Sequence, residues 1–451
     1  MCLNLRDGRQ ATLMQRLFTN IGWLLGGRGI NAVLSIVYLA LATRTLGLEM
    51  FGHFAAIVAV GLVVTGIANF QTWQFIVRWG ANGANGTNGD GTAASEATGF
   101  AIALDLLSIA MGLVLAAVLV WSAPYWLPLP EDLLPLTFGY CVVSLLAIRT
   151  TPMGLLRLRF KYAAATAAET VQPVVRTLGA VLAWIYMPTV TGFILAYAVS
   201  ELAVAVALWI AAARSERIDL SALSLTRIPA RHKDAWRFVW STNMSGSLTI
   251  AGKQITILLV GAFGGAALLG GFRVASQLGQ ALVALAQTIS KAILPELVHA
   301  KEDALVIARR MANVALIGGI LAVLFAVVFG RLGLDLIAGS EFRGRGFYWA
   351  LVILSIAGAV ELVGASLESL LVSAGRAGTA FLVRAAPTLL AFGLLDLAIG
   401  WNGALGAAFT VLGSSALAVI GFYVAILNLA EIRIEVDADK DAEAPPEPPR
   451  T

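Results

Sequence analysis

Stretches of consecutive apolar residues recur along nearly the whole chain, and they constrain its fold more than any motif does. A helix needs about 20 apolar residues to cross a hydrocarbon core of about 30 Å. Windows of that length predict twelve spans, at 18–42, 53–77, 99–122, 133–151, 163–186, 190–213, 237–262, 266–294, 308–332, 347–372, 377–399 and 403–428. The 59% hydrophobic and 13% charged residues leave too little polar surface for a water-soluble domain. We predict an all-α polytopic membrane protein with about 12 transmembrane helices.

The charged residues between the spans predict their orientation. Cytoplasmic loops of membrane proteins retain Lys and Arg. With the amino terminus in the cytoplasm, most of the 31 Lys and Arg residues lie on the cytoplasmic side. The opposite side holds Arg44, Arg331, Arg343 and Arg345. Both termini are therefore expected in the cytoplasm, and the net charge of +4 reflects this asymmetry and no nucleic-acid partner.

The two halves of the chain show an internal repeat. The matched pairs are Gly47 and Gly265, Gly52 and Gly270, Phe54 and Phe272, and Asn69 and Gln287 at a shift of 218 residues, with Pro173 and Pro387, and Gly192 and Gly406, at a shift of 214. An even number of spans per half makes the repeat parallel, and transporters commonly bind substrate between such halves. We expect a six-helix lobe at 1–213, a cytoplasmic linker at 214–236, a second six-helix lobe at 237–428 and a disordered acidic, proline-rich tail at 429–451.

Basic residues inside the spans indicate an anionic cargo. They are Arg28, Arg176, Lys253, Arg273 and Arg384. A cation near the bilayer centre costs roughly 2.5–3.5 kcal/mol, so such residues usually line a cavity or an aqueous path. Guanidinium groups form paired, charge-assisted hydrogen bonds with phosphate oxygens. Arg384 lies near the cytoplasmic end of its span, where its side chain can reach the interface.

Polar side chains follow helical periodicity along the first, second, seventh and eighth spans. The candidates for a polar cavity lining are Asn31, Asn69, Asn243, Gln254, Gln277 and Gln280. Amides of this kind often form hydrogen bonds between helices, which is the simplest explanation for each one alone. Because the four spans occupy matching places in the two halves, their polar faces are also suited to meet at one cavity and bind sugar rings.

Acidic residues inside the spans have two possible roles. They are Asp105, Glu169, Glu201, Glu361, Glu368 and Asp396. A buried carboxylate can carry a proton, so Glu169, Glu361 and Glu368 are candidates for coupling to an ion gradient. The alternative is structural pairing: Glu169 shares a helix face with Arg176, and Pro173 between them predicts a break in the helix.

Redox and metal chemistry are not expected. The two cysteines, Cys2 and Cys141, are too few and too far apart for a disulfide framework. The three histidines, His53, His232 and His299, are scattered along the chain. We therefore predict no metal site and no cofactor.

Several segments resemble the Wzx-type polysaccharide flippases of the MOP superfamily. They are RTLGLEMFGHFAAIV (44–58), GAFGGAALLGGFRVASQL (261–278) followed by ILPEL (293–297), and GSEFRG (339–344) leading to LLVSAGR (370–376). The resemblance implies a two-lobed, MATE-like bundle. Such a bundle flips undecaprenyl-diphosphate-linked oligosaccharides across the bacterial inner membrane by alternating access, in lipopolysaccharide O-antigen or exopolysaccharide biosynthesis.

The resemblance also implies a site and partners. In the cationic central cavity of such a flippase, Arg28, Lys253 and Arg273 would bind the diphosphate. The implied partners are the lipid-linked oligosaccharide, membrane lipids, a coupling proton or sodium ion, and the polysaccharide polymerase with its chain-length proteins. No enzyme activity is expected.

Other functions remain as alternatives. A MATE-like multidrug antiporter usually carries cations, and the basic residues of the first, seventh and eighth spans count against it. A major-facilitator transporter usually has a compact basic motif between its second and third spans, yet residues 80–98 contain no Lys or Arg. A membrane glycosyltransferase or polymerase usually needs a sizeable external loop, and the longest one expected here runs from Gly333 to Gly346.

Overall fold

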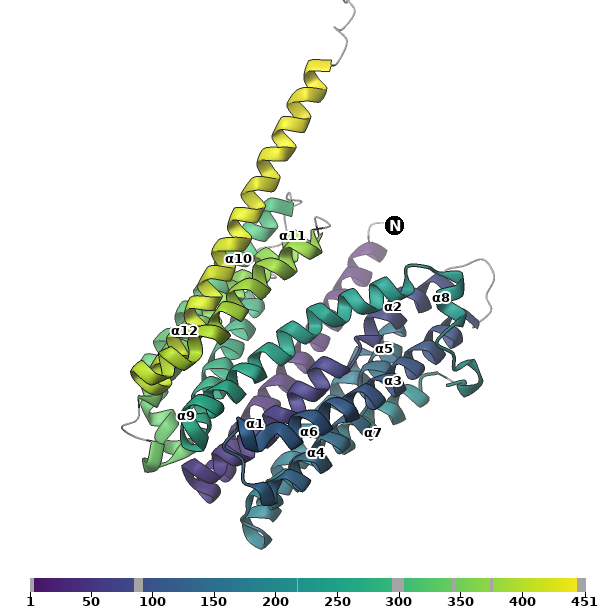
Figure 1. Cartoon of the computed structure of the whole chain (residues 1–451). Coiled ribbons are helices and arrows are strands. Elements are labelled where there is room, and N and C mark those ends of the chain that lie inside the picture. Colours follow the sequence, from purple (N-terminus) through teal and green to yellow (C-terminus); the bar gives the residue numbers. More distant parts are fainter. Residues whose placement is uncertain are drawn as a thin grey trace, which may run out of the picture. The chain divides into compact units, whose positions relative to one another are not determined.

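A computed structural model describes residues 4–84, 92–216, 218–293, 304–342, 346–373 and 376–443. The elements are α1 (Asn4–Ala68), α2 (Thr72–Ala84), α3 (Thr92–Ser122), η1 (Ala123–Tyr125), η2 (Glu131–Leu133), α4 (Leu134–Leu146), α5 (Thr150–Leu158), α6 (Tyr162–Tyr186), α7 (Val190–Ala213), η3 (Leu220–Ala222), α8 (Arg227–Arg231), α9 (Ala235–Ile293), α10 (Ala304–Ala338), η5 (Ser340–Phe342), α11 (Phe347–Ser373) and α12 (Ala377–Glu443). Across these ranges every regular element is helical (Figure 1). The predicted all-α fold is confirmed.

The described residues contain eight apolar helical segments that are long enough to cross a membrane. Val33–Gly80, with 48 residues, and Gly378–Asn428, with 51, each have the length of two crossings. The protein is therefore a multi-pass membrane protein, as predicted. The count of twelve spans and the position of the termini remain predictions.

Three long helices contain breaks that fit the internal repeat. Gly47 in α1 has φ 71° and ψ 179°, and its match Gly265 in α9 has φ 80° and ψ 174°. This extended backbone with positive φ is accessible to glycine and strained for other residues. A third break, at Asn402 and Gly403 in α12, corresponds under the shift of 214 residues to the connection between α6 and α7. Helix ends thus recur at matched positions.

A contact between α1 and α9 has the same repeat symmetry. A Cβ atom at Gly52 would lie 2.0 Å from the carbonyl oxygen of Ala266, and a Cβ atom at Gly270 would lie 2.6 Å from that of Leu48. The shift of 218 residues matches Gly52 with Gly270 and Leu48 with Ala266. Each half therefore places its own glycine against the corresponding carbonyl of the other half, as in a two-fold symmetric interface.

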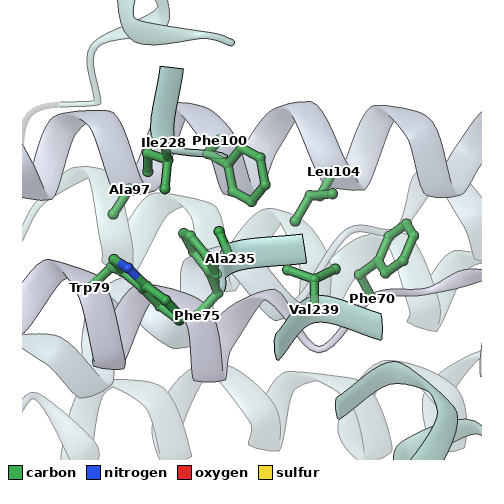
Figure 2. Close-up of a cluster of buried hydrophobic side chains, with 9 residues drawn as sticks. All are labelled: Phe70, Phe75, Trp79, Ala97, Phe100, Leu104, Ile228, Ala235 and Val239. Carbon is green, nitrogen blue, oxygen red and sulfur yellow. The ribbon is translucent and has the colours of Figure 1, made fainter. Parts of the chain in front are cut away.

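The chain forms two compact units, which are described separately. Unit 1 comprises residues 1–274 and 332–345, and unit 2 comprises 275–331 and 346–451. Unit 1 has a core in which Phe75 stacks on Trp79 at 4.5 Å between ring centroids and meets Phe100 of α3 at 4.7 Å (Figure 2). In unit 2, Phe422 of α12 packs with Leu371 and Ala380. The compact units follow side-chain packing and end elsewhere than the expected lobes, whose boundaries remain a prediction.

Two predicted spans are discontinuous. Residues 69–71 separate α1 from α2, and residues 147–149 separate α4 from α5. In membrane proteins such breaks are tolerated where protein or an internal cavity can satisfy the exposed backbone groups. The expected break at Pro173 is absent, because α6 is continuous around this proline. Proline has no N–H for the carbonyl of Glu169 four residues earlier, while the Thr177 hydroxyl donates a 2.8 Å hydrogen bond to the carbonyl of Pro173.

The carboxy-terminal residues differ from the expected disordered tail in one respect. Helix α12 continues to Glu443, because residues 429–443 contain no proline and few strong helix breakers. Residues 444–451, with the prolines, lie outside the described residues, as does most of the Asn-Gly-rich stretch at 85–91.

Replacing Gly52 by alanine should destabilise the protein. The new methyl group would collide with the Ala266 carbonyl, and overpacking of this kind costs about 1–3 kcal/mol. Gly393→Ala is the matched control, because an added Cβ atom there meets no described atom within 4 Å. Thermal unfolding of the purified protein should show a lower midpoint for Gly52→Ala alone. Equal midpoints would contradict the close contact between α1 and α9.

Candidate functional site

Unit 1 contains a cavity of about 480 Å³ with a polar lining. Its wall includes residues of α2, α5, α6 and α7, of the α4–α5 connection, and Ser35 of α1. The polar side chains of the wall include Gln71, Arg149, Arg157, Glu169, Gln172 and Arg176. Trp73, Pro173 and Leu208 supply apolar surface. A wall with three arginines and neighbouring amides suits an anionic ligand that carries hydroxyl groups.

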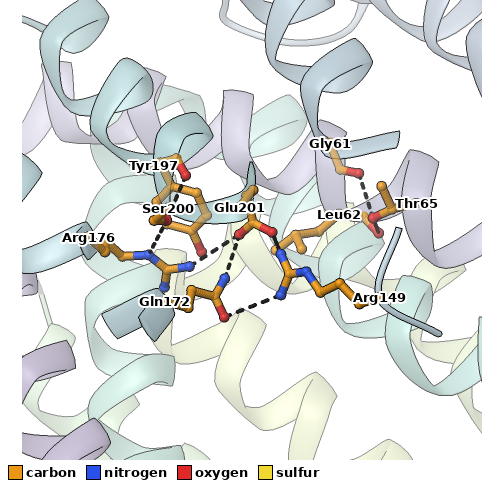
Figure 3. Close-up of polar contacts among 9 residues, drawn as sticks. All are labelled: Gly61, Leu62, Thr65, Arg149, Gln172, Arg176, Tyr197, Ser200 and Glu201. Carbon is orange, nitrogen blue, oxygen red and sulfur yellow. Dashed lines mark hydrogen bonds and ion pairs between the residues drawn. The ribbon is translucent and has the colours of Figure 1, made fainter. Parts of the chain in front are cut away.

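Two of these arginines share a single buried carboxylate. Glu201 of α7 is 7% exposed and forms ion pairs with Arg149 and Arg176, the latter at 3.2 Å (Figure 3). Gln172 donates a 2.8 Å hydrogen bond to Glu201 Oε1, and its own Oε1 accepts one of 3.3 Å from Arg149. Ser200 Oγ accepts from Arg176 Nε at 3.3 Å. Arg149 is also within electrostatic range of Glu169, so this region, with Arg157 of the cavity wall included, has three guanidinium groups against two carboxylates.

Arg157 adds a third guanidinium beside the cluster. Its guanidinium carbon lies 4.3 Å from the centre of the Trp73 ring, within the range of a cation–π interaction. Glu169 also lines the cavity, and its side chain is exposed. The cavity therefore presents arginines held by an aromatic face, a carboxylate and amide oxygens.

Tyrosines connect this cluster with Arg273 of α9. Arg176 lies 3.8 Å from the ring centre of Tyr197, and Tyr197 packs against Tyr38 and Tyr140 at 6.0 and 5.9 Å between ring centroids. Arg273 is close enough to all three tyrosines and to Arg176 to interact with them electrostatically. Its Nη1 donates a 2.9 Å hydrogen bond to Gln254 Oε1.

The hydroxyl group of Tyr38 has no hydrogen-bond partner in the described part of the chain, although it is buried. A buried polar group without a partner costs about 1–3 kcal/mol. Tyr38 lies within electrostatic range of both Arg176 and Arg273. The Tyr38 hydroxyl and the guanidinium groups of Arg176 and Arg273 are therefore hydrogen-bond donors that lie in the same region of unit 1.

The structure brings some of the predicted site residues together. Arg273 and Gln254 are in direct contact, and Asn243 is buried and accepts a 2.9 Å hydrogen bond from Ser247. Lys253 is on α9 with an exposed side chain, and Asn69 is at the break between α1 and α2. Arg28 and Asn31 lie on α1, and their side chains are outside the described residues.

Other predicted residues belong to unit 2. They are Gln277, Gln280, Glu361 and Glu368. Gln280 donates a 3.1 Å hydrogen bond to Ser276, and Arg384 Nε donates one of 3.0 Å to Glu368 Oε2. The contact between Arg384 and Glu368 shows that Arg384 is paired with an acid of the neighbouring helix, and it agrees with the structural role considered for Glu368.

The sequence prediction missed two residues of the cluster. Arg149 is not among the basic residues that the sequence predicts inside the spans, and Glu201 has no predicted partner. One signal was present, because Glu201 is the one charged residue in the span 190–213, and a lone acid in an apolar helix requires a buried donor or cation. Arg176 forms an ion pair with Glu201 across to α7, and its pairing with Glu169 on the same helix remains a prediction.

No metal site is formed by the described side chains, since no group of three or more His, Cys, Asp or Glu residues among them could hold an ion. The arrangement instead suits reversible binding of an anion by guanidinium groups.

Comparison with known proteins gives one family and one fold. The model of the family described as "Polysaccharide biosynthesis protein" matches residues 17–301. The inner membrane protein YghQ of Escherichia coli K12 is 26% identical over 297 residues, which make up 65% of this chain and 82% of YghQ.

Two solved structures have a similar fold at low sequence identity. The lipid II flippase MurJ, in an inward closed conformation, aligns with a TM-score of 0.70 and 9% identity over 89% of this chain and 87% of that chain. A mutant of the Vibrio cholerae MATE transporter VcmN aligns with a TM-score of 0.61 and 18% identity over 93% and 98%. The family match covers more than half of the chain, so this multi-pass membrane protein belongs to the polysaccharide biosynthesis protein family and has the fold of the MOP superfamily.

Proposed function

We propose that the protein is a flippase for undecaprenyl-diphosphate-linked oligosaccharide repeat units in the bacterial inner membrane. The units would serve lipopolysaccharide O-antigen or exopolysaccharide biosynthesis. The main structural support for this proposal is that Arg176, Arg273 and the Tyr38 hydroxyl, which has no partner among the described residues, lie within electrostatic range of one another inside unit 1. Family membership supports a role in polysaccharide biosynthesis, and the fold supports transport by alternating access.

A diphosphate fits this site better than a neutral sugar does. Its oxygens accept paired hydrogen bonds from guanidinium groups, and one of them can accept the free Tyr38 hydroxyl. The net positive charge around Glu201 favours an anion of more than one negative charge. Arg28, Lys253 and Arg273 remain the proposed diphosphate ligands, now with Arg149 and Arg176 as further cations.

The sugar units would contact amides and aromatic faces. We retain Asn31, Asn69, Asn243, Gln254, Gln277 and Gln280 as the proposed polar lining, and Gln172 with Trp73 extends it in the unit 1 cavity. Glu169, Glu361 and Glu368 stay as candidates for coupling, with structural pairing, including that of Arg176, as the alternative role. Membrane lipids, a polymerase and chain-length proteins are the proposed partners, and both termini are proposed to be cytoplasmic.

A MATE-like multidrug antiporter is the second candidate, because the fold is shared with a MATE transporter. A site for cationic drugs would need an excess of buried acid, whereas Glu201 faces two arginines. A polymerase or glycosyltransferase would need a catalytic acid or base at a substrate-binding face, and the cluster around Glu201 instead neutralises its carboxylate by pairing.

Arg273→Ala should impair export. Loss of a charge-assisted hydrogen bond costs about 1.5–3 kcal/mol, which corresponds to roughly a tenfold to hundredfold loss of affinity. The measurement is the amount of surface polysaccharide in a deletion strain that carries the variant, normalised to the protein level in the membrane. Lipid-linked oligosaccharide should accumulate at the inner leaflet of the same strain.

The matched control for Arg273→Ala is Arg227→Ala, which removes an exposed arginine of α8. Normal export in Arg273→Ala would remove this residue from the site. Drug sensitivity without any change in polysaccharide would favour the antiporter.

Tyr38→Phe should weaken binding without weakening the fold. The hydroxyl makes no hydrogen bond to the described residues, so its removal costs the free protein nothing, whereas the bound phosphate loses a donor worth about 0.5–1.5 kcal/mol. Export should fall severalfold while the unfolding midpoint stays unchanged. A lower midpoint together with normal export would show that the hydroxyl has a structural partner and no role at the site.

Glu201→Gln should lower stability in a way that an anionic ligand reverses. The substitution leaves Arg149 and Arg176 without their shared counter-charge, and breaking a buried pair costs about 3–5 kcal/mol. Undecaprenyl diphosphate should raise the unfolding midpoint of this variant more than that of the unmodified protein. Glu216→Gln is the control, because its pair with Arg159 lies nearer the surface and such pairs contribute about 0–1 kcal/mol.

A further inference from the structure

Asp105 of α3 is a buried acid to which the proposed cargo site assigns no role. It is 4% exposed and lies where two discontinuous helices begin, because Thr72 is the first residue of α2 and Thr150 is the first residue of α5. The carboxyl group therefore links three elements of unit 1.

Among the described side chains, threonine hydroxyls form the hydrogen bonds to this carboxyl group. Thr72 Oγ1 lies 3.3 Å from Oδ1, Thr150 Oγ1 lies 3.2 Å from Oδ1, and Thr151 Oγ1 lies 2.5 Å from Oδ2. In addition, Thr151 Oγ1 lies 3.1 Å from Thr72 Oγ1. Asp105, Thr151 and Thr72 thus form a closed ring of three hydrogen-bonding contacts.

The number of hydrogens in this ring indicates the protonation state of Asp105. Each contact needs one hydrogen, and each hydroxyl supplies one. Thr151 donates to Thr72, and Thr72 donates to Asp105 Oδ1. The contact between Thr151 and Oδ2 then requires a hydrogen on the carboxyl group, which donates to Thr151 Oγ1. An ionised Asp105 would leave one of the three contacts without a hydrogen.

The charged groups on the elements around Asp105 contact other residues. No Lys, Arg or His among the described side chains forms an ion pair with Asp105. On α5 and the preceding connection, Arg157 lies over Trp73 and Arg149 pairs with Glu201, while Arg78 of α2 lies over Trp79. The other titratable groups on elements that pack against α3 are Tyr38, Arg44, Glu49 and His53 of α1, Tyr125 of η1, Tyr140 and Cys141 of α4, and Arg227 and Arg231 of α8, of which Arg231 pairs with Glu96 of α3 itself.

A buried carboxylate without a counter-charge is strongly disfavoured inside a membrane. Protonation removes the charge and completes the ring. Thr150, which also contacts Oδ1, lines the arginine-rich cavity, so one side chain separates the carboxyl group from that space.

We infer that Asp105 is a proton-binding site that ties the start of α2 and the start of α5 to α3. When the proton leaves Oδ2, the Thr151 hydroxyl turns to donate to Oδ2, and the contact between Thr151 and Thr72 loses its hydrogen. Proton release therefore loosens the junction of the two discontinuous helices beside the cavity. This site involves none of Glu169, Glu361 and Glu368, and it requires no assumption about the cargo.

Infrared difference spectroscopy of the full-length protein in lipid bilayers tests this assignment. A protonated carboxyl group has a carbonyl stretching band that an ionised one lacks. We expect such a band at neutral pH, its loss in Asp105→Asn, and its retention in Asp219→Asn, which changes an acid in the exposed loop after α7. Absence of the band in the unmodified protein, or its persistence in Asp105→Asn, would overturn the proposal.

A second pair of variants keeps the test decisive if Asp105→Asn does not fold. Thr151→Val removes the group that accepts from the carboxyl hydrogen, so the band should shift to higher frequency, whereas Thr151→Ser keeps the hydroxyl and should leave the band in place. Equal band positions in these two variants would contradict the ring. Export measured in the same strains is a separate readout, so failure of the flippase proposal and failure of the proton site are distinguishable.

Discussion

Neutralisation of buried charge within the membrane-spanning part of the chain underlies the arrangement of unit 1. Glu201 joins α7 to α6 through Arg176 and to the α4–α5 connection through Arg149. A lone cation near the bilayer centre costs roughly 2.5–3.5 kcal/mol, so pairing with Glu201 lowers the cost of burying these two arginines. With Arg157 and Glu169 included, three guanidinium groups lie near two carboxylates.

Helix breaks supply the second organising principle. Gly47 and Gly265 interrupt α1 and α9 at matched positions, and Gly52 and Gly270 allow the two helices to approach at carbonyl contact. The breaks before α2 and α5 bring threonines to Asp105. Backbone irregularity thus occurs where glycine permits it or where hydroxyl groups satisfy it.

Much of the fold could be predicted from local sequence. Apolar length predicted the membrane class, and the glycines matched by the internal repeat, Gly47 and Gly265, lie at the breaks of α1 and α9. The breaks at 69–71 and 147–149 fall at polar residues, among them Asn69, Gln71 and Arg149, but polar residues also lie inside the continuous helix α6, so they do not by themselves predict a break. Pro173 gave an expectation that was wrong in the opposite direction, since α6 is continuous around it.

For the site, the sequence by itself determined that charged and amide side chains lie inside spans and must face protein or water. Arg176, Arg273 and Gln254 were identified on that basis. Tertiary structure decided the partners: Arg176 pairs with Glu201 of α7, Arg149 enters the cavity from a connection, and the Tyr38 hydroxyl has no hydrogen-bond partner in the described part of the chain. These choices depend on how helices distant in sequence rotate and pack against one another, and helical periodicity, which is a property of one helix at a time, does not contain that information.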